Sequence, residues 1–195
     1  IDKRSSGNVF VNGKAVRNHN VTAAIRSGIG LVPEDRKKEG IIKERAVKMN
    51  MALPSMRNFT ISGMISKVKL NRVAHEVMSD LKLRPLNIDK TIGTLSGGNQ
   101  QKVIISRWLL VTEKILILDE PTRGIDVKTK SDIYHLIDDL TATGLSIIFI
   151  SSEMPELINM CDRIVVMNQG HTTGILNRNE FNQEKIMAFA TKEIG

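Results

Sequence analysis

The last ninety residues alternate between short, largely apolar runs and stretches with helical spacing, and no other feature constrains the fold as strongly. Runs at 115–118, 145–150, 163–167 and 171–176 predict strands, and helices are expected over about 128–142, 154–160 and 179–191. Apolar strands that alternate with helices are typical of a parallel sheet covered on both faces. The sequence therefore predicts an α/β fold.

The first hundred residues carry weaker structural signals. Residues 8–16 alternate apolar and polar around Asn12-Gly13, a pair that favours a two-residue hairpin turn. A short helix is expected to end at Gly28, before a strand at 29–32 and a charged loop at 34–40. Residues 46–69 have no clean period and are interpreted as irregular or helical. A helix over 70–83, ended by Pro85, and a buried helix over 99–111 follow.

The composition is that of an ordinary globular chain with an uneven charge. The 195 residues contain one cysteine, Cys161, which excludes an internal disulfide, and no apolar run approaches the ~18–20 residues that span a bilayer. Residues 1–98 hold 18 Lys and Arg against 8 Asp and Glu, whereas residues 99–195 hold 10 against 13. A basic half could bind nucleic acid or anionic lipid, but dispersed charges and few aromatics favour a solvated surface.

The segment LSGGNQQK, residues 95–102, places two adjacent glycines at the start of the helix expected over 99–111. Backbone N–H groups in the first turn of a helix can bind an anion where no side chain obstructs them, and the hydroxyl of Ser96 is a further donor. The alternative is a plain Ser-Gly-Gly turn, with Ser96 or Asn99 near the N-cap. Taken alone, the segment favours the plain turn.

A second segment changes that balance. The strand at 115–118 runs directly into Asp119, Glu120 and Pro121, seventeen residues after the first segment. Carboxylates at the C-terminal end of a buried parallel strand lie where ligands bind in open α/β sheets. We expect Asp119 to hold Mg²⁺ through water and Glu120 to orient and polarise an attacking water. A pair of solvated loop acids is the weaker alternative, because the strand delivers both to the functional edge.

Together, LSGGNQQK and ILILDEPTRGID resemble the ABC ATPase family over residues 7–190. DEPTRGIDV and ISSEMPE are most similar to the second ATP-binding half of bacterial monosaccharide importers. The resemblance implies a P-loop NTPase-type parallel core, with ATP and Mg²⁺ as cofactors. The functional positions that it implies are the signature (Leu95, Ser96, Gly97, Gly98 and Gln100), Walker B (115–120, with Asp119 and Glu120), the D-loop Asp126, the Q-loop position Glu34 and the switch-histidine position Ser152.

This resemblance divides the chain into three parts. Residues 1–45 form a β-hairpin region with the Q-loop, 46–98 a mainly helical subdomain that holds the signature, and 99–195 an α/β core with Walker B and a C-terminal helix. The family places Walker A, the phosphate loop, upstream of the hairpin, so we expect it to be absent. The stretch from Gly7 to Ala15 does not match G-x-x-x-x-G-K-[ST], because five residues separate its glycines and alanine replaces the hydroxyl.

Two further positions depart from the family pattern. Glu34 stands where the family has glutamine, and Ser152 where it has histidine. Serine cannot act as a base at neutral pH as imidazole does. We therefore expect the signature chiefly to complete the ATP site of a partner half. Because Walker A is missing, we also expect the chain alone to be inactive.

The resemblance implies an importer subunit that couples ATP binding and hydrolysis to uptake of a small solute, a monosaccharide. Its partners would be a second ATP-binding half, transmembrane permease subunits and, indirectly, a periplasmic solute-binding protein. The expected location is peripheral, at the cytoplasmic side of the inner membrane. One alternative is a soluble ABC ATPase that acts on nucleic acid or ribosomes, although that class usually keeps the switch histidine. The other is a non-catalytic regulatory module that only dimerises.

Overall fold

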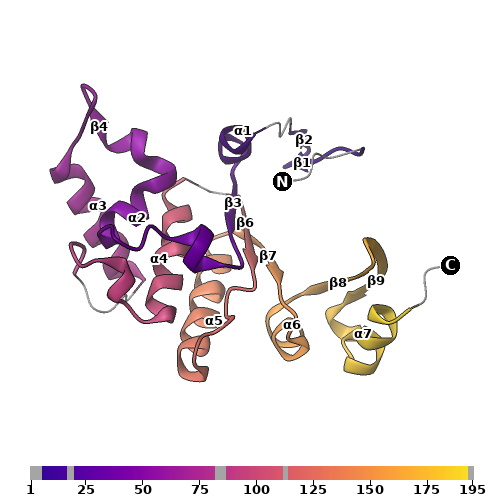
Figure 1. Cartoon of the computed structure of the whole chain (residues 1–195). Coiled ribbons are helices and arrows are strands. Elements are labelled where there is room, and N and C mark those ends of the chain that lie inside the picture. The colour runs from indigo at the N-terminus through magenta and orange to yellow at the C-terminus, as the bar shows by residue number, and fades with distance from the viewer. Residues whose placement is uncertain (1–5, 17–19, 82–86, 112–113, 193–195) are drawn as a thin grey trace. The chain divides into compact units, whose positions relative to one another are not determined.

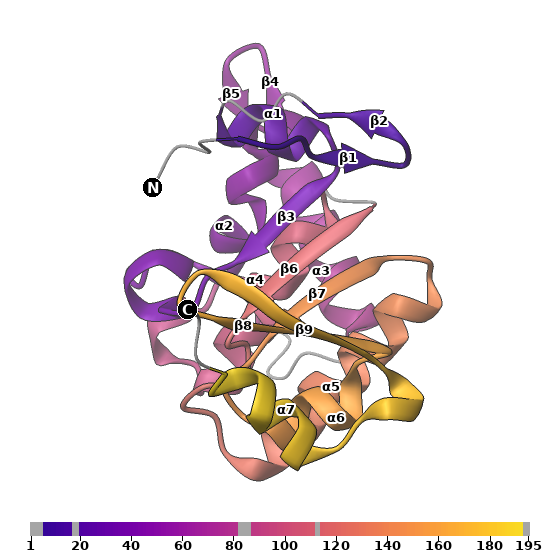
Figure 2. The same ribbon diagram turned by 90° about the vertical axis from the view of Figure 1, so that its right-hand side faces the viewer.

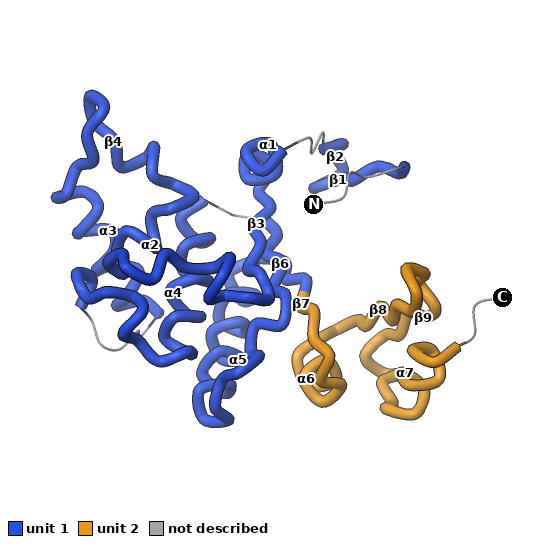
Figure 3. Tube along the Cα trace, viewed as in Figure 1, with its two compact units in different colours: residues 1–148 blue, residues 149–195 orange. Residues whose placement is uncertain are grey.

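The computed structural model describes residues 6–16, 20–81, 87–111 and 114–192. The chain divides into two compact units, residues 1–148 and 149–195 (Figure 3). Within the described ranges, no helix combines the length and the apolar character needed to cross a membrane. Pro85, the predicted end of one helix, lies outside the described residues.

A three-stranded sheet in the order β3-β6-β7 is the centre of the first unit. Its strands are β3 (Ile29–Val32), β6 (Ile115–Asp119) and β7 (Ser146–Ile150), and β3 and β6 run parallel, as predicted. Val32, Leu116 and Leu118 are buried, because alternate side chains of each strand point to one face of the sheet. The helices α4 (Gly97–Leu109) and α5 (Val127–Ala142) lie on one side of this sheet (Figures 1 and 2).

The two faces of this sheet differ in how its own unit covers them. Leu31 and Ile148, on the residues that alternate with the buried ones, keep 47% and 50% of their surface exposed. The physical reason is the placement of α4 and α5 on the same side. The parallel core also begins earlier than predicted, because β3 belongs to the same sheet as β6.

The N-terminal hairpin has the predicted form. β1 (Phe10–Val11) and β2 (Lys14–Ala15) pair antiparallel around Asn12 and Gly13, whose φ values of 51° and 72° suit a tight two-residue turn. α1 (Val21–Arg26) follows, with the side chain of Asn20 accepting a 2.9 Å hydrogen bond from the Ala23 amide. Gly28, with φ of 83°, ends this helical segment and leads into β3.

Residues 46–81, which gave no clean period in their first part, fold into short elements. They are α2 (Val47–Ala52), a 3₁₀ segment η2 (Leu53–Phe59), a hairpin of β4 (Thr60–Ile61) and β5 (Met64–Ile65), and α3 (Lys67–Asp80). Ala52, Phe59 and Leu70 form a buried cluster between them. Elements of two to seven residues are too short to produce a period, which explains the weak sequence signal.

Two buried polar residues fasten α4 to this helical region. The side chain of Asn50 accepts a 2.8 Å hydrogen bond from the Ile42 amide and donates to the carbonyls of Ile42, Arg45 and Ala46. Arg107 of α4 donates from Nε to the Asn50 carbonyl at 2.9 Å. Burial lowers the pKa of Arg107 to about 10. The helix that begins at the glycine pair is thereby anchored at its far end.

The second unit is built from α6 (Met154–Met160), β8 (Arg163–Asn168), β9 (His171–Asn177), a 3₁₀ turn η4 (Arg178–Glu180) and α7 (Gln183–Ala190). Here the prediction of further parallel strands is wrong, because β8 and β9 form an antiparallel hairpin. The two-residue connection Gln169-Gly170, with φ of 46° and 81°, permits only an antiparallel return. The buried core of the unit comprises Ile164, Val166, Leu176 and Ile186.

Candidate functional site

The candidate site lies where β3 and β6 end side by side. Because Val32 pairs with Leu118, the chain leaves both strands at the same edge of the sheet. Glu34 follows one strand, and Asp119 and Glu120 end the other. Ligands of open α/β sheets bind outside the carboxyl ends of parallel strands. The structure thus brings the predicted carboxylates and the Q-loop position to one edge.

Glu120 has an unusual backbone conformation. Its φ is 44°, in the left-handed region, which costs a residue with a side chain about 1–3 kcal/mol. The Glu120 carbonyl accepts a 3.1 Å hydrogen bond from the Arg123 amide, which closes a tight turn over Pro121 and Thr122. Both of these turn residues are buried, so the turn is held by its packing. Strained residues held in this way are concentrated at functional sites.

The signature turn, residues 95–98, precedes α4. Ser96 is the N-cap residue and is exposed, but its side chain makes no capping hydrogen bond. The first intrahelical bond runs from the Gln100 amide to the Ser96 carbonyl, so the amides before Gln100 have no partner within the helix. Gly97 is partly exposed. The free hydroxyl, the first-turn amides and the helix dipole form the arrangement that binds anions.

Gly98 has a packing role that the sequence did not reveal. It is buried, and a Cβ at this position would collide with the Cγ2 methyl group of Thr129 and lie 3.6 Å from the side chain of Ile125. Only glycine therefore lets the start of α4 lie against the start of α5. The two glycines differ: Gly97 is partly exposed and lies against the guanidinium of Arg36, and Gly98 sets the approach of two helices.

The buried side chain of Gln100 supports the signature turn from within the protein. Its Nε2 donates to the carbonyls of Ile92 and Leu95 at 3.3 and 3.1 Å. These bonds connect α4 to η3 (Ile92–Thr94) and to the residue that begins the signature turn. The Nε2 group is thus engaged within the protein, where it braces Leu95.

Asp126, the predicted D-loop residue, caps α5. Its carboxylate accepts a 3.0 Å bond from the Thr129 amide and a 2.7 Å bond from the Thr129 hydroxyl. The hydroxyl bond, followed by the amide bond, lowers the pKa of Asp126 below its ordinary value. Since Thr129 also contacts Gly98, the D-loop and the signature turn meet at one side chain.

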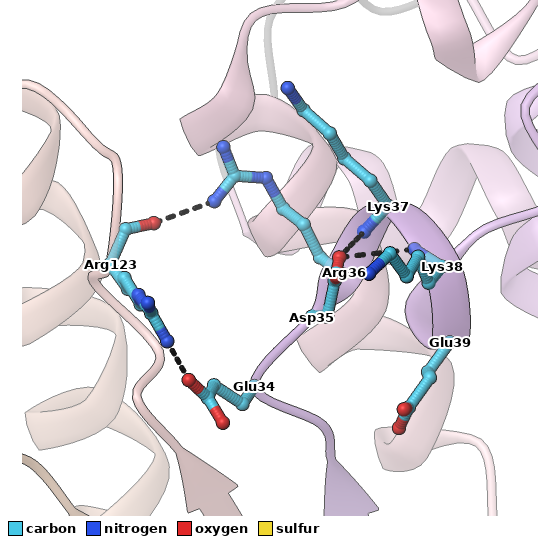
Figure 4. A pocket seen from close by; sticks show the side chains of 7 residues that line it. All are labelled: Glu34, Asp35, Arg36, Lys37, Lys38, Glu39 and Arg123. Carbon is cyan, nitrogen blue, oxygen red and sulfur yellow. Dashed lines mark hydrogen bonds and ion pairs between the residues drawn. The ribbon is translucent and has the colours of Figure 1, made fainter.

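The segment after β3 forms a charged cleft of about 480 Å³ (Figure 4). It is lined by Glu34, Asp35, Arg36, Lys37, Lys38, Glu39 and Arg123. The expected loop at 34–40 is wrong in its second part, since Arg36–Gly40 forms one turn of π-helix. Asp35 caps this turn by accepting from the amides of Lys37 and Lys38, each at 3.1 Å. The Lys38 amide bond is the main reason that the pKa of Asp35 is lowered.

The sequence patterns did not predict that two arginines, Arg123 and Arg36, belong to the site. Arg123 forms an ion pair with Glu34, and Figure 4 shows the two side chains pointing toward each other. Arg36 donates to the carbonyls of Arg123 and Gly124 at 2.8 and 3.3 Å. Arg36 stands within the charged segment 34–40, and a single sequence holds no signal that one of these charges turns toward the protein.

Ser152, the switch-histidine position, belongs to the second unit. It is exposed, just before α6. The neighbouring Ser151 is the residue that organises this loop, because its hydroxyl donates to Glu156 at 2.7 Å and accepts from the Glu153 amide at 3.0 Å. Position 152 thus carries a hydroxyl group in place of an imidazole.

The carboxylates of the site suit a metal ion that binds together with a phosphate ligand. In the part of the chain that the structure describes, no group of three or more His, Cys, Asp or Glu could hold a metal ion. Mg²⁺, however, is commonly held by one or two carboxylates together with waters and substrate phosphates. Asp119 and Glu120, both partly exposed at the sheet edge, match that requirement.

The comparison with protein families matches residues 1–123 to the ABC transporter model. A ribose import ATP-binding protein of Streptomyces coelicolor is 44% identical over 97% of this chain, and one of Lactococcus lactis is 42% identical over 98%. A putative ribose/galactose/methyl galactoside import ATP-binding protein of Agrobacterium fabrum is 43% identical over 97%. The chain spans only 37–39% of the length of these relatives.

Solved structures agree on the fold. A nucleotide-free ATP-binding cassette from an ABC transporter superposes with a TM-score of 0.77 at 22% identity, covering 98% of this chain and 79% of that chain. A dimeric ATP-binding cassette in a post-hydrolysis state, bound to ADP and Pi, gives 0.73 at 23% identity, covering 92% and 77%. At these identities the likeness supports the α/β fold alone.

Proposed function

Because the chain belongs to the ABC transporter family of ATP-binding proteins, we propose that it is part of an ATP-driven importer of a monosaccharide. Relatives at 42–44% identity are named as ribose or ribose/galactose/methyl galactoside import proteins, which supports this solute class. The observation that carries the proposal is the signature turn: an exposed Ser96 with an uncommitted capping hydroxyl, and a partly exposed Gly97 that opens α4.

In the proposed mechanism this turn closes an ATP site whose phosphate loop belongs to a second ATP-binding half. The Ser96 hydroxyl and the Gly97 amide would donate hydrogen bonds to the terminal phosphate, and the α4 dipole would add about 0.3–1 kcal/mol. ATP would thus hold the two halves together, and hydrolysis would release them. Opening and closing would drive the access change in transmembrane permease subunits.

The carboxylates at the end of β6 have separate proposed roles. Asp119 would hold Mg²⁺ through water, and Mg²⁺ would neutralise charge on the transferred phosphoryl group. Glu120 would orient and polarise the attacking water, in a conformation that the buried turn after β6 fixes in advance. A preset base needs no rearrangement at the moment of reaction.

Two features limit turnover at this chain's own carboxylates. Ser152 offers no group that titrates near pH 7, and Glu34 is already engaged by Arg123. Its chief contribution would therefore be to complete the partner's site. Such a protein would work peripherally at the cytoplasmic face of the inner membrane, and a periplasmic solute-binding protein would act on it only through the permease.

A charge placed on the signature turn tests the proposal. Gly97→Asp puts a carboxylate where the terminal phosphate would lie, so ATPase activity and sugar uptake of the assembled transporter should fall by about 10²–10³-fold. Thr94→Asp adds the same charge at an exposed position just before the turn and should leave both activities near normal. Normal uptake with Gly97→Asp would end the proposal.

The chain by itself provides a second test. It contains no G-x-x-x-x-G-K-[ST] sequence, so its backbone offers no phosphate loop. The purified 195-residue chain should bind ATP weakly and hydrolyse almost none of it. Robust, Glu120-dependent turnover by this chain alone would show that the proposed division of the site between two halves is wrong.

A further inference from the structure

A single guanidinium links three segments that lie far apart in the sequence. The carboxyl ends of β3 and β6 are neighbours, which brings the 34–36 segment beside the turn at 120–124. Arg36 bridges this gap with two hydrogen bonds, one from Nη1 to the Arg123 carbonyl (Figure 4) and one from Nη2 to the Gly124 carbonyl. The ion pair between Glu34 and Arg123 joins the same two segments, but here the cation belongs to the turn at 120–124 and the anion to the 34–36 segment.

The same guanidinium also touches the signature turn. A Cβ built on Gly97 would lie 2.5 Å from Nη2 and 3.3 Å from Cζ of Arg36, so a side chain at position 97 would have to displace the guanidinium from this place. A planar guanidinium with donors in a rigid fork can serve two carbonyls while its edge packs on a third segment. A lysine ammonium is a point charge and lacks that geometry.

We propose that Arg36 is a positioning residue that sets the place of Gly97 relative to the turn after Glu120. The signature turn, with its proposed role in phosphate binding, and the turn after Glu120, with its proposed role in water activation, are then both supported by Arg36. Any displacement of the 34–40 segment moves both together. This inference deepens the proposed function and rests on it for its catalytic consequence, but its structural content can be measured without ATP.

The hydrogen bonding of Arg36 allows a positioning role to be distinguished from a simple contribution to stability. Its Nε is shielded from solvent and has no hydrogen-bond partner. Arg36→Lys removes this unpaired donor and keeps the charge, so the variant should unfold at about the same urea concentration as the parent. It nevertheless loses the two guanidinium donors that bond to the carbonyls of Arg123 and Gly124. An effect of charge alone would predict the opposite pattern, in which Arg36→Lys restores every property.

Hydrogen–deuterium exchange on the 195-residue chain tests the shared support. Arg36→Ala and Arg36→Lys should both speed exchange at 100–103, where the first hydrogen-bonded amides of α4 lie, and at 122–126, by about 3- to 30-fold. Exchange in β8 and β9 serves as an internal reference. Lys38→Ala, a change at an exposed neighbour, should alter neither segment. Faster exchange in only one of the two segments, or in neither, would overturn the inference.

A double substitution tests the contact with Gly97 directly. Gly97→Ala pushes Nη2 away and should loosen the carbonyl contacts at 123–124, although residue 97 itself is not bonded to that turn. In the Arg36→Ala background, Gly97→Ala should then add no further exchange at 122–126. Additive effects of the two substitutions would contradict the proposed route.

The assembled transporter gives the catalytic readout. Arg36 makes no part of a phosphate loop, so Arg36→Lys should lower kcat by about 10- to 100-fold while the KM for ATP stays within about twofold. Unchanged kcat in a variant with altered exchange would overturn the positioning role. Absence of ATP turnover in the unsubstituted transporter would instead count against the proposed function, and the exchange results would stand.

Discussion

The methyl group of Thr129 occupies the place that a side chain on Gly98 would need. This contact joins the first turn of α4 to the first turn of α5 at a distance that only a glycine allows. The hydroxyl of the same threonine is engaged by Asp126. The second glycine of the signature segment is thus explained by helix packing, independently of any ligand.

Gly98→Ala should destabilise the chain by about 1–3 kcal/mol, the cost of overpacking a fitted contact. Urea unfolding followed by circular dichroism measures this change. Thr129→Ser removes the obstructing methyl group and keeps the hydroxyl, so it should restore most of the lost stability in the double variant. Equal stability of Gly98→Ala and the parent would show that the contact is not tight.

The pKa of Asp126 should depend on the Thr129 hydroxyl. Thr129→Val keeps the shape and removes the main donor, so the pKa should rise toward the ordinary value of 3.8, whereas Thr129→Ser should leave it low. Because the folded pKa is depressed, the stabilisation is present above pH 3.8 and is lost as the pH falls through the folded value. NMR titration of the carboxyl group measures this pKa. Identical values in all three proteins would contradict the assignment.

Asn50 is a buried side chain that satisfies four backbone groups. Asn50→Ala leaves the Ile42 amide and three carbonyls without this partner, so the free energy of unfolding should fall by about 2–3 kcal/mol. Asn58→Ala, at an exposed site nearby, should change stability by less than about 0.5 kcal/mol. A small effect at Asn50 would mean that water replaces its bonds.

Cys161 should react slowly with thiol reagents. Burial is the main cause that raises the pKa of its thiol, and the charge of Asp162 adds to the shift. A raised pKa means less thiolate at a given pH, so alkylation of the folded chain at pH 8 should be slower than that of free cysteine. Arg178 opposes the shift, and Arg178→Ala should slow the reaction further. A rate equal to that of free cysteine would contradict this environment.

The sequence predicted most of the elements that have a strong local signal. The hairpin at Asn12-Gly13, the helix end at Gly28 and the strand at 115–118 each depend on local turn chemistry or an apolar run, and all are confirmed. The antiparallel pairing of β8 and β9 was not predicted, because the apolar runs at 163–167 and 171–176 look alike in parallel and antiparallel sheets. Local chemistry could identify strands, but not their partners.

In the candidate site, too, some features could be predicted from the sequence and others could not. The carboxylates Asp119 and Glu120 could be placed at a sheet edge from the strand that precedes them. The contacts of Arg36 could not, because they join segments 87 and 88 residues apart along the chain. Burial of Gly98 and Gln100 likewise depends on how α4 meets its neighbours. Such relationships arise from packing, which a single sequence does not encode in any local pattern.

In the proposed mechanism, the signature turn closes over ATP held by a second half. Ser96→Cys, in a Cys161→Ala background, places on this chain a single thiol at the exposed start of α4. Maleimide labelling of the assembled transporter, with and without a non-hydrolysable ATP analogue, measures whether the turn becomes covered. We predict at least about tenfold slower labelling with nucleotide, and no change for Thr94→Cys. Equal rates at position 96 with and without nucleotide would contradict the account.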